Sequence, residues 1–248
     1  MPKPSLHLTF LQTSVHQQLS IEEALLRTDQ RNICLVNRGT PPAIVMGISG
    51  QADRLIDREV WESAPVPIIK RFSGGGTVFV DPSTWFVTWI MNSEDVGVKG
   101  CPVAIHGWSA EIYRQAFPAL NLQLIENDYV IGQRKCGGNA QYLTKGRWLH
   151  HTSFLWDYDP ANMRYLLMPQ KRPAYRQNRP HDAFLCRLSE HFPSFAQMQQ
   201  LLLESLETRF EVHAMAEAQL TEICTRPHRK STLFVELPDG IAQGHDIK

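Results

Sequence analysis

The segment Lys70-Arg71-Phe72-Ser73-Gly74-Gly75-Gly76-Thr77-Val78-Phe79-Val80-Asp81 places three adjacent glycines between two strand-like runs, 66–71 and 77–80. Glycine leaves room for backbone amides to approach an anion, and it can take the positive φ angles that concave loops require. Arg71 adds a planar guanidinium suited to phosphate or carboxylate. Glycine clusters also mark turns. The segment therefore predicts either an anion-binding loop or a plain hairpin turn.

Outward from this loop, strands are expected at 6–10, 32–36, 43–46, 85–91, 122–131 and 147–156, and helices at 19–28, 103–117, 195–210 and 215–224. The first helix is predicted to begin at the N-cap Ser20, followed by the acidic pair Glu22 and Glu23. The proline-containing basic segment 168–180 is expected to be a mobile surface loop. This order of elements predicts an α+β fold, a central mixed β-sheet flanked by helices. We expect a single domain over 1–248, with a helical C-terminal part from about 190 to 248.

Composition and charge exclude several classes of protein. Lys plus Arg and Asp plus Glu are equal at 25 each, so no bulk field favours nucleic acid or membrane. The five cysteines are odd in number and widely spaced, which argues against a disulfide framework and a zinc knuckle. No apolar run is long enough for a membrane span, and the N-terminus lacks a signal-peptide pattern. We expect a cytoplasmic protein.

A second glycine-rich segment, 127–141, contains Lys135 next to Cys136-Gly137-Gly138. Gly132 is expected to form the turn of a hairpin, with Lys135 projecting from the second strand and its ammonium unobstructed. A lysine in a strand is also common as a solvated edge residue. Strand alternation predicts that Cys136 faces away from Lys135, which favours a buried cysteine over a nucleophile.

Acid activation would explain a lysine in this position. A carboxylate that attacks the α-phosphate of ATP brings two anions together, at a cost on the order of 4 kcal/mol at about 4 Å and an effective dielectric of about 20. A positioned ammonium offsets much of that repulsion, and Arg71 could assist from the other side. His150 and His151 occupy adjacent positions in a predicted strand, so they cannot both ligate one metal. We expect one to point toward the glycine-rich site and the other outward.

These motifs resemble those of the lipoate-protein ligases, in the biotin/lipoate ligase superfamily. Arg71-x-Ser-Gly-Gly-Gly-Thr-Val-Phe-x-Asp81 resembles their R-x-S-G-G-G-A-V signature, and Lys135-Cys-Gly-Gly-Asn-Ala140 their K-[IVF]-[SG]-G-[SN]-A segment. His150-His151-Thr152-Ser153 is similar to their H-H-G-T strand, and Asn127-Asp128 to the N-D before the lysine. The matches occur in family order over roughly residues 5 to 185.

The resemblance implies ATP-dependent formation of lipoyl-adenylate, followed by transfer of the lipoyl group to a lysine of a lipoyl domain. It implies ATP and Mg²⁺ as cofactors, lipoate as substrate, and a catalytic role for Lys135 and Arg71. By position, the nucleotide would contact Arg71, Gly74, Gly75, Gly76, Thr77, Val78, Phe79, Asn127, Asp128 and Lys135. Lipoate would contact Arg71, Ser73, Gly75, Lys135, Asn139, Ala140 and His151, in a tunnel beneath the glycine loop. Asp128 is the candidate Mg²⁺ ligand, and the loop at Lys171 to Arg179 corresponds in position to one that covers the adenylate.

The implied acceptors are lipoyl domains of 2-oxoacid dehydrogenase complexes or the glycine cleavage H protein. The sequence departs from the family pattern at Thr152, in place of the usual glycine, which we expect to reshape the tunnel floor. We also expect the family's C-terminal accessory domain to be absent, so the enzyme would act alone, use a separate partner chain, or only transfer. Two rival functions stay open: a cysteine-dependent or carrier-protein-dependent octanoyltransferase of the same fold, and a non-catalytic protein that binds lipoyl domains.

Overall fold

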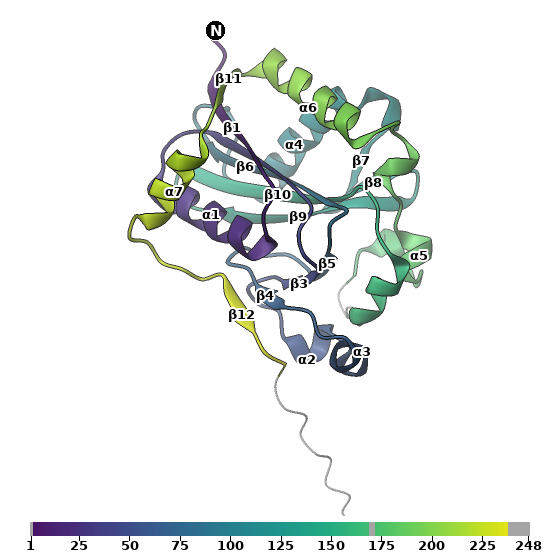
Figure 1. The fold of residues 1–248 in the computed structure, drawn as a ribbon. Coiled ribbons are helices and arrows are strands. Elements are labelled where there is room, and N and C mark those ends of the chain that lie inside the picture. The colour runs from purple at the N-terminus through teal and green to yellow at the C-terminus, as the bar shows by residue number, and fades with distance from the viewer. Residues whose placement is uncertain (1, 169–171, 238–248) are drawn as a thin grey trace, which may run out of the picture.

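Eight strands form a mixed sheet in the order β11-β1-β2-β6-β10-β9-β8-β7 (Figure 1). The computed structural model describes residues 2–168 and 172–237. Strands β11, β1 and β2 are parallel, and the other neighbours pair antiparallel. The strands are β1 (Ser5–Leu11), β2 (Ile33–Arg38), β6 (Thr84–Asn92), β7 (Gln123–Ile125), β8 (Asp128–Ile131), β9 (Arg134–Leu143), β10 (Arg147–Leu155) and β11 (Glu211–Ala214).

A second, four-stranded sheet carries the glycine loop. Its order is β12-β4-β3-β5, with bounds β3 (Ala43–Met46), β4 (Ile68–Lys70), β5 (Val78–Val80) and β12 (Leu233–Val235). The glycines lie in the connection from β4 to β5, and β3 separates these two strands in the sheet. The short helices α2 (Ala52–Leu55) and α3 (Arg58–Ser63) lie below this sheet in Figure 1. The glycine segment is thus a loop between non-adjacent strands, and the alternative of a plain hairpin turn is wrong.

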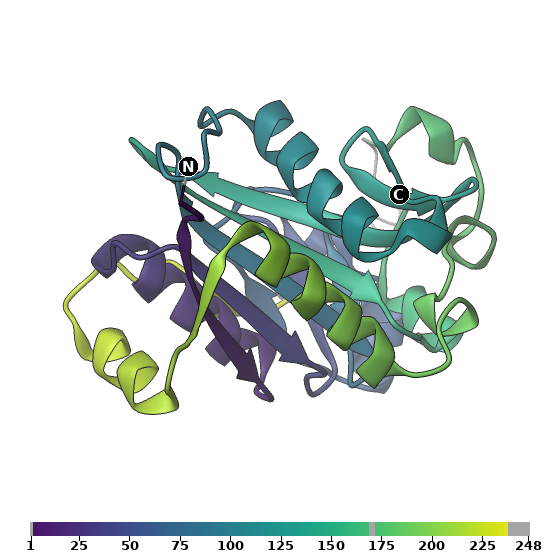
Figure 2. The ribbon, with the colours of Figure 1, turned by 90° about the horizontal axis from the view of Figure 1, so that it is seen from above.

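Four longer helices cover both faces of the central sheet. Helices α4 (Pro102–Ala116) and α6 (Phe195–Arg209) lie on one face, and α1 (Val15–Thr28) and α7 (Glu217–Thr225) on the other (Figure 2). Strand β6 is buried along almost its whole length, as expected for a strand with both faces covered. Trp85, Trp89 and Trp148 are fully buried in the cluster under α4 and α6. These findings confirm the predicted α+β fold.

The first helix begins earlier than the sequence suggested. Its N-cap is Ser14, whose side chain accepts a hydrogen bond from the backbone N–H of Gln17. Ser20 lies inside the helix and donates to the carbonyl of His16, so its assignment as the N-cap is wrong. Glu22 and Glu23 consequently lie in mid-helix, where both are buried. Neither carboxylate is near enough to the N-terminus to interact with the helix dipole there. Each is instead bound to a residue outside the helix, Glu22 to His151 and Glu23 to Ser231.

The C-terminal part is not purely helical. The two predicted helices are present as α6 and α7, but two strands that the sequence did not reveal occur with them. β11 extends the central sheet beside β1, and β12 pairs antiparallel with β4, where Leu233 lies opposite Lys70. The chain therefore returns to support the strand that leads into Arg71. Residues 238–248, the end of this expected helical part, lie outside the described residues.

Within the described ranges, no helix has the length and apolar character that crossing a lipid bilayer requires.

Candidate functional site

The glycine loop is held together by Arg71. Its Nη2 atom donates to the carbonyl oxygens of Gly74 and Gly76 at 2.9 Å each, and its Nε atom donates to Gly74 at 3.2 Å. Gly75 has a φ of +108°, and a Cβ there would lie 2.6 Å from Arg71 Nη2. The loop also passes so close to Gly47 that a Cβ on Gly47 would lie 2.2 Å from the Gly75 oxygen. Glycine is thus required at position 75 by both backbone angle and space.

Arg71 is buried, with an exposed fraction of 3%. Burial lowers the pKa of Arg71 to about 10, although the charge of Glu22 opposes that change. The guanidinium is therefore still charged at neutral pH. It lies directly against the loop, and its side-chain hydrogen bonds are to the carbonyl oxygens of Gly74 and Gly76.

Ser73 is the residue in this loop with an unmet hydrogen bond. Its side chain is fully buried, and its Oγ atom has no hydrogen-bond partner among the residues that the structure describes. Buried hydroxyls nearly always have a partner, so an orphaned one needs an explanation, such as a ligand. Ser73 is one of the predicted lipoate contacts.

A β-bulge decides the direction of the Lys135 side chain. In the β8–β9 hairpin, Val130 pairs with Lys135, but the preceding Tyr129 pairs with Gly137. Cys136 is thus an extra residue in β9, opposite no partner of its own. An inserted residue reverses the alternation of side chains. Lys135 and Gly137 would share one face of a regular strand, but across the bulge they point to opposite faces of β9.

The bulge brings Lys135 and the glycine loop to one face of β9. A Cβ on Gly138 would lie 3.0 Å from Lys135 Nζ, so the ammonium lies over Gly138. Two residues further along the same face, Ala140 contacts the loop, since a Cβ on Gly75 would lie 3.3 Å from its Cβ atom. Asn139 faces the other side, where its Oδ1 atom accepts a 2.7 Å hydrogen bond from Thr152. Of the two predicted lipoate contacts at 139 and 140, only Ala140 shares the face of Lys135.

The Lys135 ammonium is not free. Its Nζ atom lies 2.8 Å from Oδ1 of Asp128, and the two side chains are 22% and 8% exposed. The hydroxyl of Tyr175 donates to the other oxygen, Oδ2, at 2.8 Å. The expectation of an unobstructed ammonium was therefore wrong, because the sequence did not reveal its partnership with Asp128.

Asp128 fits only a magnesium ion that arrives with other ligands. Among the described residues, no group of three or more His, Cys, Asp and Glu side chains gathers to hold a metal. Mg²⁺ commonly takes one or two protein carboxylates and completes its shell with water and substrate phosphates. The single carboxylate of Asp128 suits that mode.

The remaining predicted nucleotide contacts lie around the loop and the hairpin. Thr77 and Val78 are half-buried where the loop enters β5, and Asn127 is exposed just before β8. Asn127 also accepts a hydrogen bond from the Asn139 side chain at its backbone oxygen. The ring of Phe79 is buried against Tyr165, with ring centroids 5.1 Å apart. Only the backbone of Phe79 is therefore available to a ligand.

His151 is joined to a residue that the sequence did not mark as functional. Its Nδ1 atom lies 3.0 Å from Oε2 of Glu22. Thr88 and Gln18 donate to Oε1 of the same carboxylate, at 2.6 and 2.8 Å. Burial alone would raise the pKa of Glu22, but the His151 charge and the donated hydrogen bonds hold it below its ordinary value. The charge of Glu22 also opposes the fall in the pKa of Arg71 that burial causes, so this buried network is linked electrostatically to the residue that holds the glycine loop.

His150 points to the opposite face of the sheet. Its Nε2 atom lies 3.1 Å from Ser109 Oγ, and its Nδ1 atom 3.1 Å from Gln141 Nε2. Burial, followed by the charges of His106 and His151, places the pKa of His150 well below its ordinary value. The two histidines face opposite sides as predicted, but the expectation that one points outward is wrong, because helices cover both faces.

Thr152 also faces α4, where its hydroxyl contacts Tyr113 and Asn139. It is therefore on the side of the sheet away from the glycine loop. The expectation that Thr152 reshapes the floor of a tunnel beneath that loop does not agree with this position.

Cys136 is a core residue, as predicted. Its side chain is fully buried, and its thiol donates to the carbonyl of Tyr129 at 3.4 Å. Burial raises the pKa of Cys136 well above its ordinary value. A thiol in this state is a poor nucleophile.

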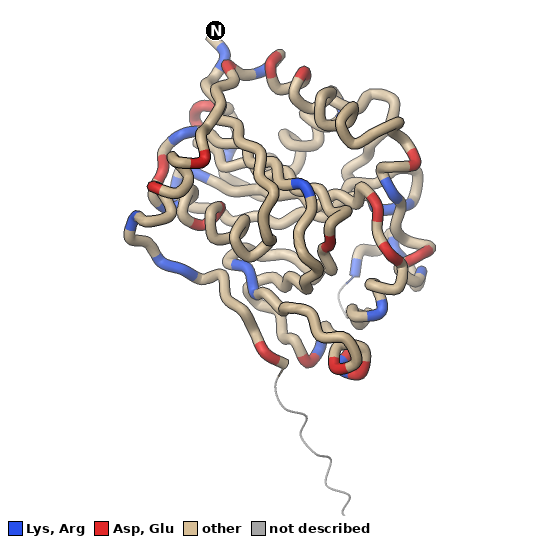
Figure 3. Tube along the Cα trace, in the orientation of Figure 1, with Lys and Arg blue, Asp and Glu red and all other residues tan. Residues whose placement is uncertain are grey.

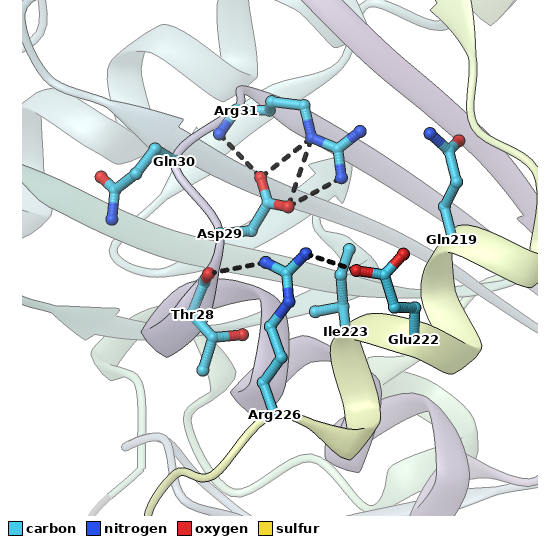
Figure 4. Close-up of a pocket in the computed structure, with 8 residues that line it drawn as sticks. All are labelled: Thr28, Asp29, Gln30, Arg31, Gln219, Glu222, Ile223 and Arg226. Carbon is cyan, nitrogen blue, oxygen red and sulfur yellow. Dashed lines mark hydrogen bonds and ion pairs between the residues drawn. The ribbon is translucent and has the colours of Figure 1, made fainter.

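A separate polar hollow of about 400 Å³ lies between α1 and α7 (Figure 4). Its charged side chains pair with one another, Asp29 with Arg31 and Glu222 with Arg226. It is lined by Thr28, Asp29, Gln30, Arg31, Gln219, Glu222, Ile223 and Arg226. None of the predicted site residues is among them.

Residues 14–207 match the family model described as the lipoyl protein ligase A/B catalytic domain. The chain belongs to this family. The match includes the glycine loop, the bulged strand β9 and both histidines of β10.

The lipoyl ligase family relationship extends to individual proteins. An inactive lipoate–protein ligase 2 from Plasmodium falciparum is 30% identical over 189 residues, which cover 62% of this chain and 49% of that protein. This chain spans about half the length of the curated relatives it matches. The name of the first relative shows that family membership does not by itself establish catalysis.

Solved structures share the fold of this lipoyl ligase family member. Lipoate-protein ligase A bound with ATP has a TM-score of 0.73 at 15% identity, over 90% of this chain and 92% of that one. A bi-partite lipoate protein ligase from Thermoplasma acidophilum, solved in a study with its E2 lipoyl domain, has 0.72 at 17%, over 90% and 91%. P. falciparum LipL1 in complex with lipoate has 0.65 at 18%, over 89% and 70%.

Proposed function

We propose that this chain is an ATP-dependent lipoate-protein ligase. It would form lipoyl-adenylate from lipoate and ATP, and then transfer the lipoyl group to a lysine of a lipoyl domain. The observation that carries the proposal is the shared face of β9, on which the Lys135 ammonium and the Arg71-held glycine loop lie together. Solved structures of the same fold with bound ATP or bound lipoate support the proposal that this site takes both.

In the first step, a carboxylate oxygen of lipoate bonds to the α-phosphorus of ATP. The bond from that phosphorus to the bridging oxygen breaks, and pyrophosphate leaves. Lys135 would contact the lipoyl carboxyl and the α-phosphate, and offset the repulsion between them. Arg71 keeps the loop in shape, and the unpaired Ser73 hydroxyl would hydrogen-bond the lipoyl group near its reacting end. Asp128 would hold a Mg²⁺ ion that arrives with the nucleotide, and the ion would neutralise phosphate charge there.

In the second step, the acceptor lysine amine attacks the acyl carbon, AMP leaves, and the amine loses a proton to give the amide. The acceptors we propose are lipoyl domains of 2-oxoacid dehydrogenase complexes or the glycine cleavage H protein. The T. acidophilum neighbour is bi-partite and is paired in its study with a lipoyl domain. A separate chain that supplies an accessory domain is therefore part of the proposal.

The deciding experiment follows the mass of an unmodified lipoyl domain after incubation with the protein. We expect modification with lipoate, ATP and Mg²⁺, and none when ATP is omitted. Modification only from preformed lipoyl-adenylate would indicate that the protein catalyses the transfer step but not the activation of lipoate. Modification only from octanoyl-carrier protein would indicate an octanoyltransferase, and no modification would favour a binding protein or a missing partner chain.

Two variants assign the chemistry. Lys135→Ala is expected to abolish pyrophosphate release while the fold remains, and the exposed Lys145→Ala, in the adjacent β9–β10 turn, is the matched control. Near-normal pyrophosphate release by Lys135→Ala would refute the role of Lys135. Cys101 is exposed, so full activity of Cys101→Ser would exclude a thioester route through this cysteine.

A further inference from the structure

Residues 172–184, here called the basic loop, pack against the hairpin that carries Lys135. The backbone N–H of Ala174 donates to Glu126 Oε1 at 2.6 Å, and Arg179 Nη1 donates to the carbonyl of Gln133 at 2.8 Å. Just after the loop, Cys186 N donates to the carbonyl of Lys135 at 2.9 Å. Several basic positions lie on this segment before α5 (His181–Phe184) (Figure 3). The expected loop is therefore packed on the hairpin over 172–180, while Lys171 lies outside the described residues.

One side chain of the basic loop reaches into the site. Tyr175 lies in a short 3₁₀ turn, Ala174–Arg176, and its ring packs on Phe184 with centroids 5.3 Å apart. Its hydroxyl donates to Oδ2 of Asp128 at 2.8 Å. A tyrosine hydroxyl is protonated at neutral pH, so it is the donor in this hydrogen bond and the carboxylate is the acceptor.

The Asp128 carboxylate is thus shared between two elements. Oδ1 lies 2.8 Å from Lys135 Nζ, and Oδ2 accepts from Tyr175. Hydrogen bonds to a charged acceptor are short and directional. A carboxylate held at both oxygens cannot rotate freely, so the position of Tyr175 determines where Oδ1 presents itself to the ammonium.

We propose that Tyr175 is a positioning residue for Lys135. By holding Oδ2 of Asp128, it leaves Oδ1 to the ammonium and keeps Lys135 over Gly138. The seating of the basic loop is thereby linked to the placement of Lys135 on the face of the glycine loop. The catalytic consequence rests on the proposed function of Lys135, but the positional claim can be tested without turnover.

The first test measures the position of Lys135 in the free protein. Lysines are acetylated with a limiting amount of an amine-reactive acetylating reagent, and the rate at each lysine is measured by mass spectrometry. The exposed Lys99 and Lys145 serve as internal references. Tyr175→Phe removes one hydroxyl and keeps the ring. We expect Lys135 labelling to rise at least about threefold, because the carboxylate that shields the ammonium loses its fixed orientation.

Tyr165→Phe is the matched control. The Tyr165 hydroxyl also donates to a protein oxygen at 2.6 Å, the carbonyl of Ala64 at the end of α3. Its loss should leave the relative labelling of Lys135 unchanged. Unchanged labelling of Lys135 in Tyr175→Phe, or an equal rise in both variants, would overturn the proposal.

The second test asks whether Tyr175 acts through Asp128. Lipoate activation is measured as pyrophosphate release. We expect Tyr175→Phe to lower kcat about tenfold and to change KM for ATP and for lipoate by no more than about twofold, because a misplaced catalytic group reduces the rate more than it weakens binding. In an Asp128→Asn background, Tyr175→Phe should have little further effect on kcat or on Lys135 labelling. Effects that add independently in this double-mutant cycle would contradict the proposal.

The two tests separate the proposals. If the wild-type protein shows no ATP-dependent activation, the proposed function fails, while the labelling experiment still decides the role of Tyr175. If the wild-type protein is active and labelling at Lys135 is unaffected by Tyr175→Phe, only the positioning role fails.

Discussion

Lys135 and Gly138 share one face of β9, so close that an added Cβ on Gly138 would lie 3.0 Å from the lysine Nζ atom. Their separation of three positions would place them on opposite faces of a regular strand. The bulge at Cys136 brings them together. The two neighbouring glycines of this segment consequently have different functions, since Gly138 accommodates the lysine and Gly137 accommodates the core.

Alanine substitution should mainly reduce activity at Gly138 and mainly reduce stability at Gly137. Gly138→Ala meets the flexible end of Lys135, so we expect a stability loss below about 1 kcal/mol but at least about a tenfold loss in the rate of lipoate activation. Gly137→Ala places a Cβ 2.7 Å from the buried ring of Phe154. That overpacking should cost about 1–3 kcal/mol of unfolding free energy. Urea unfolding and pyrophosphate release measure both effects, and a Gly138→Ala protein that is unstable yet fully active would contradict the assignment.

The glycine loop offers a second matched pair. Gly75→Ala forces a residue with a side chain to a φ of +108° and against Arg71, so we expect about 1–3 kcal/mol of destabilisation. A Cβ on Gly76 would meet nothing within 4 Å, and its φ is not positive. Thermal unfolding of Gly76→Ala should therefore stay within about 0.5 kcal/mol of wild type. Equal stability of the two variants would show that Arg71 does not fix the loop.

The parts of this site that the sequence predicted are those marked by local chemistry. Glycines 74–76 and 132 interrupt runs of β-branched and aromatic residues, so both the loop and the hairpin could be placed before the structure was known. Strand alternation also placed Cys136 in the core correctly. These features depend on residues only a few positions apart.

The parts that it did not predict depend on distant residues. The bulge at Cys136 arises from the register with β8, and nothing in the composition of β9 signals it. Glu22 is 129 positions from its partner His151, and Tyr175 is 47 positions from Asp128. A single sequence does not contain such pairings, whereas their chemistry is plain once the fold has brought them together.

Glu22 should contribute to stability in a pH-dependent way. Its folded pKa lies below the ordinary value of 4.5, so the contribution is complete above that value and is lost as pH falls through the folded pKa. Glu22→Gln should cost about 1–3 kcal/mol at pH 7, and the difference from wild type should shrink at pH values below 4.5. Urea unfolding from pH 7 to pH 3 provides the measurement.

The matched control for Glu22 is Glu62, whose ion pair with Arg58 is exposed, at 57% for the glutamate. Glu62→Gln should change stability by less than about 0.5 kcal/mol at any pH. A Glu22→Gln protein whose deficit is the same at pH 7 and pH 3 would contradict the direction of the Glu22 pKa shift.

Glu23, the neighbour of Glu22 in α1, should hold the C-terminal strand in place. Its Oε2 atom accepts from the backbone N–H groups of Ser231 and Thr232, at 2.8 and 3.1 Å. Glu23→Ala leaves both amides unpaired, and we expect a loss of about 2–4 kcal/mol. Because β12 pairs with β4 next to Arg71, amide hydrogen exchange should accelerate in 231–235 and in the glycine loop. The exposed ion-pair variant Glu222→Ala should cost no more than about 1 kcal/mol, and exchange confined to 231–235 in Glu23→Ala would show that β12 does not support the loop.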